Sequence, residues 1–327
     1  MLVLSGRDVE ELLDLDRLID AVAAAMVDLS AGRVSMPDRI GAFVDAPRTG
    51  ILDMPVYVPS TGSLASKLVS IFPGNSGTEL PVRQAVIVAF DPANGAPAAL
   101  MDATYLTAAR TAAGSALSAK LLARADAATL AVLGTGAQAR EHIRAVARVR
   151  PIETIRIAGR NLAAAQALAR ELADEVGARI TATDSWQDAL RDADIACGTT
   201  YADEPVLRRA WITPGAHLTS IGYNPRGREI DDETIAEAAL FVEDRHAALT
   251  ATPPNLDIAE PISRGVITAD DIAGTLGELV TGSVDGRTGD EQITLYKSVG
   301  VAVQDAAAAT LVLAAAREQG RGQQVDL

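Results

Sequence analysis

The feature that most constrains the fold is residues 128–139, where an apolar run ends in a short glycine-rich segment. Gly134, Gly136 and Ala139 fit the G-x-G-x-x-A form of the dinucleotide-binding fingerprint. The first glycine permits a tight turn, the second leaves the backbone open to a pyrophosphate, and the small third residue lets a helix pack on the strand. Residues 129–133 are typical of a buried strand and residues 137–148 of a helix. The segment predicts a nucleotide site at a helix N-terminus, with a plain strand–turn–helix corner as the alternative.

Strand and helix patterns alternate from this segment onward. Residues 155–159 and 217–222 predict strands, and residues 162–176 and 231–239 predict helices. Such alternation indicates a parallel sheet with right-handed crossover connections. At the end of the chain, residues 293–316 predict one long, buried, apolar helix.

The first third of the chain has a different pattern. Residues 7–31 and 107–124 predict helices, whereas residues 38–92 hold short β-rich pieces separated by Pro, Gly and Asp, as in a mostly antiparallel sheet. We therefore expect an α/β fold in which a Rossmann-type parallel-sheet nucleotide domain is inserted in an α+β domain. The expected division is residues 1–118 with 296–327 for the α+β domain and residues 119–295 for the nucleotide domain.

Charge and cysteine content exclude several classes of protein. The 327 residues carry a formal net charge of −14, whereas binding to nucleic acid or to an anionic membrane needs a basic face. Cys197 is the only cysteine, which excludes a disulfide framework and a zinc cluster. The three histidines are scattered and predict no metal site. The acidic first residues do not resemble a signal peptide, so we expect a cytoplasmic protein.

The end of the second strand of the nucleotide domain bears on the choice of cofactor. In NAD-binding folds an acidic residue there accepts hydrogen bonds from the ribose 2′-hydroxyl. Here Gly159, Arg160 and Asn161 follow the strand, so no carboxylate repels a 2′-phosphate and Arg160 can pair with one. This predicts NADP, with NAD still possible; a solvated arginine in a turn is the alternative.

Three charged residues of the N-terminal unit are candidates for substrate chemistry. Lys67 lies in an otherwise apolar strand, where burial would lower its pKa towards a range useful for acid–base catalysis. An exposed lysine on an edge strand is the alternative. Arg110 is the only charge at the start of an Ala-rich helix and can offer its planar guanidinium to a substrate carboxylate. Arg39 is a weaker candidate, because an arginine beside Pro and Asp is usually solvated.

Several segments together resemble the ornithine cyclodeaminase/mu-crystallin family over both units of the chain. The resemblance implies a homodimer whose substrate domains pair, with each active site in the cleft between substrate and nucleotide domains. It also implies that Lys67 is the catalytic lysine, that Arg39 and Arg110 bind the substrate carboxylate, and that residues 298–300 close over substrate and nicotinamide. The matching segments are residues 52–59, 66–75, 85–116, 132–146, 214–222 and 294–309.

One position departs from the pattern of the family's cyclodeaminases. They carry an aspartate soon after the glycine that corresponds to Gly222, and this chain has Asn224 there. An amide cannot take a proton from an amine or activate water. Residues 222–230 hold no aspartate, and Asp231 is expected to cap the next helix.

The resemblance then favours the family's reductases. They transfer hydride from NAD(P)H to the imine carbon of a 2-imino acid or cyclic ketimine; the reverse reaction is that of an L-amino acid dehydrogenase. Two alternatives stay open: an ornithine cyclodeaminase-type lyase with tightly bound NAD, and a non-catalytic protein that binds NADP and a small ligand.

The expected site therefore draws on both units of the chain, and its expected ligand is a small amino or imino acid. Lys67 and Asn224 are the expected catalytic residues. The residues expected to contact substrate are Arg39, Met54, Arg110, Val299 and Gly300. The residues expected to bind the cofactor are Thr111, Gly134, Thr135, Gly136, Ala137, Gln138, Gly159, Arg160, Asn161, Thr199, Thr200, Ser220, Gly222 and Ser298.

Overall fold

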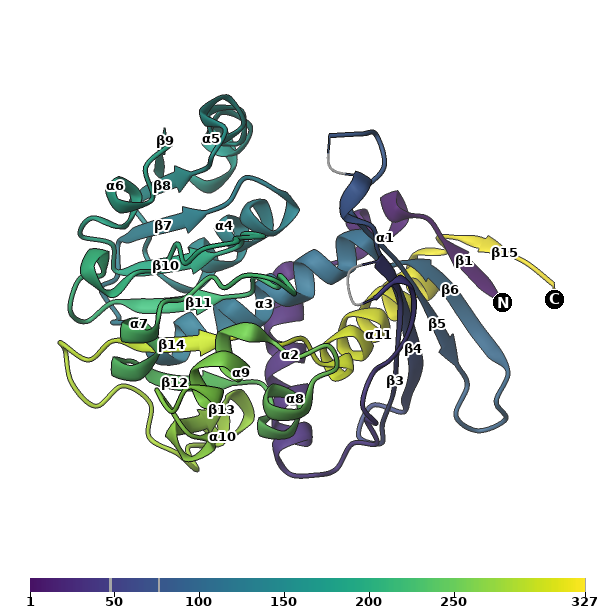
Figure 1. The fold of residues 1–327 in the computed structure, drawn as a ribbon. Coiled ribbons are helices and arrows are strands. Elements are labelled where there is room, and N and C mark those ends of the chain that lie inside the picture. The colour runs from purple at the N-terminus through teal and green to yellow at the C-terminus, as the bar shows by residue number, and fades with distance from the viewer. Residues whose placement is uncertain (47–48, 76, 327) are drawn as a thin grey trace.

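Two sheets organise the molecule (Figure 1). The computed structural model describes residues 1–46, 49–75 and 77–326. One sheet, at the left of Figure 1, has eight strands and the other has seven. Among the residues described, no helix is both long and apolar enough to cross a bilayer.

The eight-stranded sheet is parallel throughout, as the alternating pattern predicted. Its strand order is β13-β12-β14-β11-β10-β7-β8-β9, so the order reverses between β7 and β10. In open α/β sheets, ligands bind outside the carboxyl ends of the strands at such a reversal. The strands are β7 (Thr129–Leu133), β8 (Thr154–Ala158), β9 (Arg179–Thr183), β10 (Ile195–Gly198), β11 (His217–Ser220), β12 (Ala239–Val242), β13 (Ile272–Thr275) and β14 (Thr294–Lys297).

Helices cover both faces of this sheet, and its strands are apolar because both faces are buried. Apolar side chains of the strands pack into one core on each face. The helices are α4 (Ala137–Val149), α5 (Leu162–Val176), α6 (Trp186–Leu190), α7 (Asp232–Glu237), α8 (Arg245–Thr250), α9 (Leu256–Ser263) and α10 (Leu276–Thr281).

The seven-stranded sheet has the order β15-β1-β6-β5-β4-β3-β2, and only the β1–β6 pair is parallel. Both chain termini lie at its β15–β1 edge, so the parallel-sheet unit is inserted in this one. Its strands are β1 (Leu2–Leu4), β2 (Ile40–Asp45), β3 (Thr49–Val58), β4 (Ser63–Ile71), β5 (Arg83–Phe90), β6 (Pro97–Asp102) and β15 (Gln323–Gln324). Its helices are α1 (Gly6–Leu12), α2 (Leu15–Ser30), α3 (Thr104–Leu122) and α11 (Ala302–Gln319).

Helix α3 runs between the two sheets (Figure 1), and its small residues let neighbours approach it on nearly every side. Two buried histidines of the nucleotide unit hold it. His142 Nε2 lies 2.8 Å from Ser115 Oγ, and His217 Nε2 lies 3.1 Å from Ser118 Oγ. Burial lowers the pKa of His142 to about 4 and that of His217 to about 3, so both are neutral tethers.

Two predicted helices were wrong. Residues 293–316 form strand β14 and helix α11, separated by a loop in which Gly300 has φ +75°. The expected domain boundary at residue 296 therefore falls inside β14, a strand of the parallel sheet. Residues 7–31 form two helices, because Asp14 interrupts the pattern and caps the second one through Arg17 N.

Candidate active site

Lys67, Asp305 and Arg110 form a buried charged cluster between the sheet and the last helix. Strand β4 alternates, and Lys67 lies on its inner face opposite Met54 of β3 and Ile87 of β5. Lys67 Nζ is 2.8 Å from Asp305 Oδ2, and Arg110 Nε is 2.8 Å from Asp305 Oδ1. All three residues are at most 5 % exposed. Lys67 is therefore on a central strand, and the alternative of an exposed edge lysine is wrong.

The protonation of Lys67 is balanced between two opposing effects. Burial disfavours the charged ammonium, and the Asp305 carboxylate partly offsets this, so the pKa of Lys67 falls to about 8. The side chain is mostly protonated at neutral pH and can give up its proton at little cost. A group with that pKa suits general acid–base catalysis.

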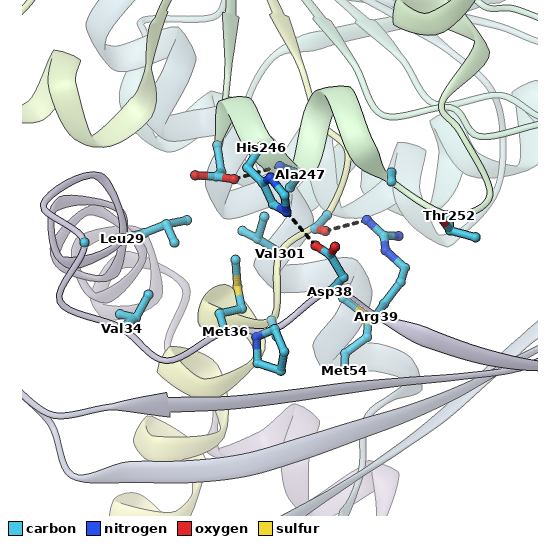
Figure 2. A pocket seen from close by; sticks show the side chains of 16 residues that line it. Leu29, Val34, Met36, Asp38, Arg39, Met54, His246, Ala247, Thr252 and Val301 are labelled. Carbon is cyan, nitrogen blue, oxygen red and sulfur yellow. Dashed lines mark hydrogen bonds and ion pairs between the residues drawn. The ribbon is translucent and has the colours of Figure 1, made fainter.

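Arg39 joins the cluster from the segment between α2 and β2, and Figure 2 shows its guanidinium against the 298–300 loop. Its Nη2 donates to the carbonyl oxygens of Val299, at 2.9 Å, and Gly300, at 3.1 Å. A cavity of about 210 Å³ adjoins Arg39 and Met54 on the side where Asp38 pairs with His246 at 2.9 Å.

Glu243 holds the same 298–300 loop from the nucleotide side. The fully buried carboxylate accepts from Ser298 Oγ at 2.6 Å, Val299 N at 2.9 Å and Gly300 N at 3.2 Å. The loop that contacts Arg39 is thus fixed to the end of β12, and the two units of the chain meet through it.

These elements enclose a cavity of about 120 Å³, called here the substrate cavity. It brings together nine of the predicted residues from segments far apart in the sequence. They are Arg39, Met54, Lys67, Arg110, Thr111, Gln138, Ser298, Val299 and Gly300.

A second cavity of about 510 Å³, the nucleotide cleft, lies at the carboxyl ends of β7 and β10. Gly134 has φ +128°, and a side chain there would collide with Thr199, so the turn requires glycine. A Cβ on Gly136 would meet nothing within 4 Å, which leaves that backbone open to the cleft. The predicted residues that line the cleft are Gly136, Ala137, Gln138, Arg160, Thr199, Thr200 and Gly222.

The two cavities share part of their lining, including Thr107 and Gln138. Thr107 Oγ1 and Gln138 Oε1 are buried there and have no hydrogen-bond partner among the residues described. Buried polar atoms are rarely left unpaired, so this junction suits a polar group of a ligand. The cleft thus fits a dinucleotide whose reactive end reaches the substrate cavity.

Not every predicted residue reaches a cavity. Asn224 is turned away: its Nδ2 donates to Ala202 O and Asp203 Oδ1, both at 2.9 Å, and its neighbour Tyr223 lines the substrate cavity instead. Ser220 is fully buried and donates to Glu229. Asn161 caps α5 through Ala164 N. Gly134 and Thr135 follow β7 and Gly159 follows β8, and none of the three is among the residues that line the cleft.

The prediction missed three buried acids that organise the site: Asp305, Glu243 and Glu229. Glu229 accepts from Thr200 N and Oγ1, both at 2.7 Å, and from Gly222 N at 2.9 Å. It therefore fixes the loops after β10 and β11 that line the cleft. Asp305 had the same signal as Lys67 and Arg110, a charge within an apolar stretch, and could have been found by it.

The sequence of this chain is similar to those of known proteins over most of its length. A model of the ornithine cyclodeaminase/mu-crystallin family matches residues 1–320. The ketimine reductase mu-crystallin of Mus musculus is 34 % identical over 314 residues, covering 94 % of this chain and 95 % of that protein.

Two solved structures have the same fold. The Δ1-pyrroline-2-carboxylate reductase of Thermococcus litoralis, in complex with NADH and L-proline, superposes with a TM-score of 0.95 at 37 % identity, covering 99 % of this chain and all of that one. An archaeal alanine dehydrogenase dimer with bound NAD gives a TM-score of 0.91 at 30 % identity, covering all of this chain and 99 % of that one.

Proposed function

The chain belongs to the ornithine cyclodeaminase/mu-crystallin family, and we propose that it is an NAD(P)H-dependent reductase of a 2-imino acid or cyclic ketimine, and in reverse an L-amino acid dehydrogenase. The observation that carries this is the substrate cavity itself. A lysine and arginines face it, it adjoins a dinucleotide cleft, and no aspartate or glutamate is among the described residues that line it. A diamino acid such as ornithine would find no carboxylate there for its second amine.

The side chains of the cavity suit such a reaction. The guanidinium groups of Arg39 and Arg110 bind the substrate carboxylate, which fixes the neighbouring carbon and nitrogen. The Lys67 ammonium lies beside that nitrogen and supplies or accepts its proton. Asp305 holds Lys67 and Arg110 in place and keeps the lysine protonated near neutral pH.

The cofactor would be held by backbone and small residues of the nucleotide cleft. The N-terminus of α4 and the open backbone at Gly136 would receive the pyrophosphate. The unpaired atoms of Thr107 and Gln138 suit the polar end of a nicotinamide, which supplies the hydride when bound. Ser298 and Thr111 line the cavity close to this junction.

We propose NADP as the preferred form of the cofactor. Arg160 is exposed, lines the cleft and has no ion pair or hydrogen bond with any residue that the structure describes, so it is available to a 2′-phosphate. The known neighbours named above bind NADH or NAD, which keeps NAD as the alternative.

A substrate panel tests the proposed reaction. Purified protein would be given cyclic imines, or 2-oxo acids with ammonia or methylamine, and NADPH or NADH. We expect oxidation of the reduced cofactor with at least one substrate and formation of the corresponding L-amino acid. Release of ammonia from ornithine or lysine, with no net change in the cofactor, would instead establish the lyase.

We also propose a homodimer that pairs through the outer face of the seven-stranded sheet. Helices α3 and α11 pack on its inner face, and the burial of β3 to β6 alternates so that apolar side chains also lie on the outer face. Ile51 and Val86 are exposed, and Leu68, Val88 and Leu100 are half-buried. A second copy would cover this face, and the archaeal neighbour is a dimer. Val86→Glu should reduce the mass in sedimentation from dimer to monomer.

The reaction uses reduced nicotinamide and amino acids, so we propose a cytoplasmic location.

A further inference from the structure

Arg83, at the start of β5, faces the substrate cavity but belongs to none of the contacts described above. Arg83, Ala85 and Ile87 share the inner face of β5. Ile87 lies opposite Lys67, and Arg83 lies opposite Ile71, four residues further along the strand. Four residues of strand span about 13 Å. Arg83 therefore lines the cavity further along the same sheet than Lys67.

Among the residues that the structure describes, none supplies a counter-charge to the guanidinium of Arg83. Lys67 and Arg110 share Asp305, and Arg39 donates to two carbonyl groups. Arg83 is half-buried, yet within the described parts of the chain its side chain makes no hydrogen bond or ion pair. Burial lowers its pKa, as expected of a cation that lacks compensation. A partly desolvated arginine without an acid is costly unless a ligand supplies the anion.

A second polar atom at the same end of the cavity is also unpaired. Tyr223 Oη is buried and has no hydrogen-bond partner among the residues described. Tyr223 also lines a small pocket with Ile71, the residue opposite Arg83, so both side chains border the same stretch of the cavity lining. One donates through a guanidinium and the other through a hydroxyl, and an anionic oxygen between them would satisfy both.

The net positive charge of the cavity lining also favours an anionic ligand. Its lining has four cations, Lys67, Arg39, Arg83 and Arg110, and no acidic residue among those described. The carboxylate of a simple imino acid would occupy the Arg39–Arg110 end and leave Arg83 unpaired. The intervening wall is apolar, with Leu52, Val69 and Ile71. A ligand that fits has anionic groups at both ends and a short carbon chain between them.

We propose that Arg83 and Tyr223 form a second anion subsite in the substrate cavity, and that the substrate is a 2-imino dicarboxylate, whose side-chain carboxylate binds there. This rests on the reductase function proposed above and specifies its substrate class. Hydride adds to the imine carbon, the nitrogen takes a proton, and NAD(P)H becomes NAD(P)⁺; the second carboxylate binds without reacting.

The same chemistry has one other source, because Arg83 also lines the nucleotide cleft. A phosphate group of the dinucleotide presents anionic oxygens as well. The two sources differ in what an Arg83→Met variant changes: the KM of a dicarboxylate substrate, or the Kd of the cofactor.

The kinetic test compares oxaloacetate plus ammonia with pyruvate plus ammonia, each at saturating NADPH. We expect the wild type to prefer the dicarboxylate. Arg83→Met should lower kcat/KM for the dicarboxylate on the order of 10- to 100-fold, mainly through KM, since a hydrogen bond to a charged group is lost. Tyr223→Phe should have a smaller effect in the same direction. Values for pyruvate, and the Kd of NADPH, should stay within about twofold, on the scale of one weak contact.

A matched control and a binding measurement separate the possible failures. Arg148→Met removes an exposed arginine paired with Asp16 and should change neither substrate. Equal losses for both substrates, or a weaker cofactor Kd alone, would overturn the subsite. Calorimetric titration of L-aspartate and L-alanine into the NADPH complex measures the subsite without turnover, because an amino acid and a reduced cofactor cannot react with each other. If the protein reduces no imine but binds aspartate more tightly than alanine, and Arg83→Met abolishes that difference, the subsite is supported and the reductase is rejected. Equal binding of the two amino acids would reject the subsite.

Discussion

The residues that line the nucleotide cleft, here called the nucleotide wall, differ in kind from those that line the substrate cavity, here called the substrate wall. The nucleotide wall presents backbone and small side chains, such as Gly136 and Thr200, and keeps its acids Glu229 and Glu243 buried behind them. The substrate wall presents long cationic side chains on rigid elements, with Asp305 beneath two of them. The substrate wall therefore concentrates positive charge, whereas the nucleotide wall would hold the dinucleotide mainly through backbone and small side chains, with Arg160 as the cation proposed for a 2′-phosphate. Substitutions in the substrate wall should therefore change the kinetics of the imine substrate, and substitutions in the nucleotide wall should change cofactor binding.

The largest effect is expected at Lys67. Lys67→Met should lower kcat/KM for imine reduction about 10²- to 10⁴-fold, because it removes the group that manages the proton. The folded pKa of Lys67 is about 8, so the ammonium is present below that pH. The wild-type rate of reduction should fall as pH rises through about 8, and this alkaline limb of the pH–rate profile should be absent in the variant. Lys120→Met, on the exposed end of α3, is the control and should behave as wild type.

Asp305→Asn comes next and acts through the lysine. Asp305 raises the pKa of Lys67 against burial, so its loss should move the alkaline limb of the pH–rate profile to lower pH. Breaking a buried ion pair also costs about 3–5 kcal/mol of stability, which urea unfolding would measure. An unshifted limb in a folded Asp305→Asn protein would show that Asp305 does not set the protonation of Lys67.

The substrate wall is the harder of the two to predict from sequence, as Lys67, Arg110 and Asp305 show. Lys67 and Arg110 were found because a charge in an apolar run has few structural explanations. Asp305 has the same signal, but its pairing with Arg110 is not visible in the sequence, because the two residues are 195 apart and only the fold brings them together. The predicted helix over residues 293–316 also hid strand β14, because a fully buried parallel strand has no polar alternation and cannot be told from a buried helix by periodicity.

The nucleotide wall, by contrast, is encoded locally. The strand, the glycine turn and α4 follow one another within residues 129–149. Helix α5 begins and ends at the predicted residues because Asn161 caps its start and Gly177, with φ +69°, ends it. The parallel sheet followed from alternation alone. Asn224 marks the limit of such inference: its place in a motif was clear, but the direction of its side chain depends on Ala202 and Asp203 of a different loop.

A glutamate substitution tests the nucleotide wall. Glu229→Gln should weaken cofactor binding about tenfold, since the acceptor that fixes Thr200 and Gly222 loses its charge. The KM of the imine at saturating cofactor should change little, because Glu229 does not line the substrate cavity. Fluorescence titration with NADPH gives the Kd. Glu237→Gln, an exposed glutamate paired with Arg209, is the control; an imine KM that rises as much as the cofactor Kd would mean that the walls are not separate.

The smallest effect is expected at Arg160. Arg160→Ala should lower the preference for NADPH over NADH about tenfold and leave the NADH parameters unchanged, since a single exposed charge pair is lost. Steady-state kinetics with both cofactors measure the ratio. Arg170→Ala, on the exposed face of α5, is the control. An unchanged ratio would place the cofactor preference elsewhere in the cleft.

The stoichiometry of the reaction tests most directly the claim that this site consumes its cofactor as a reagent. The measurement follows reduced nicotinamide and amino acid product in the same sample, with the best imine of the panel. We expect one equivalent of NAD(P)H to be oxidised for each L-amino acid formed. Product formation with no net oxidation of the cofactor, accompanied by ammonia release from a diamino acid, would contradict it.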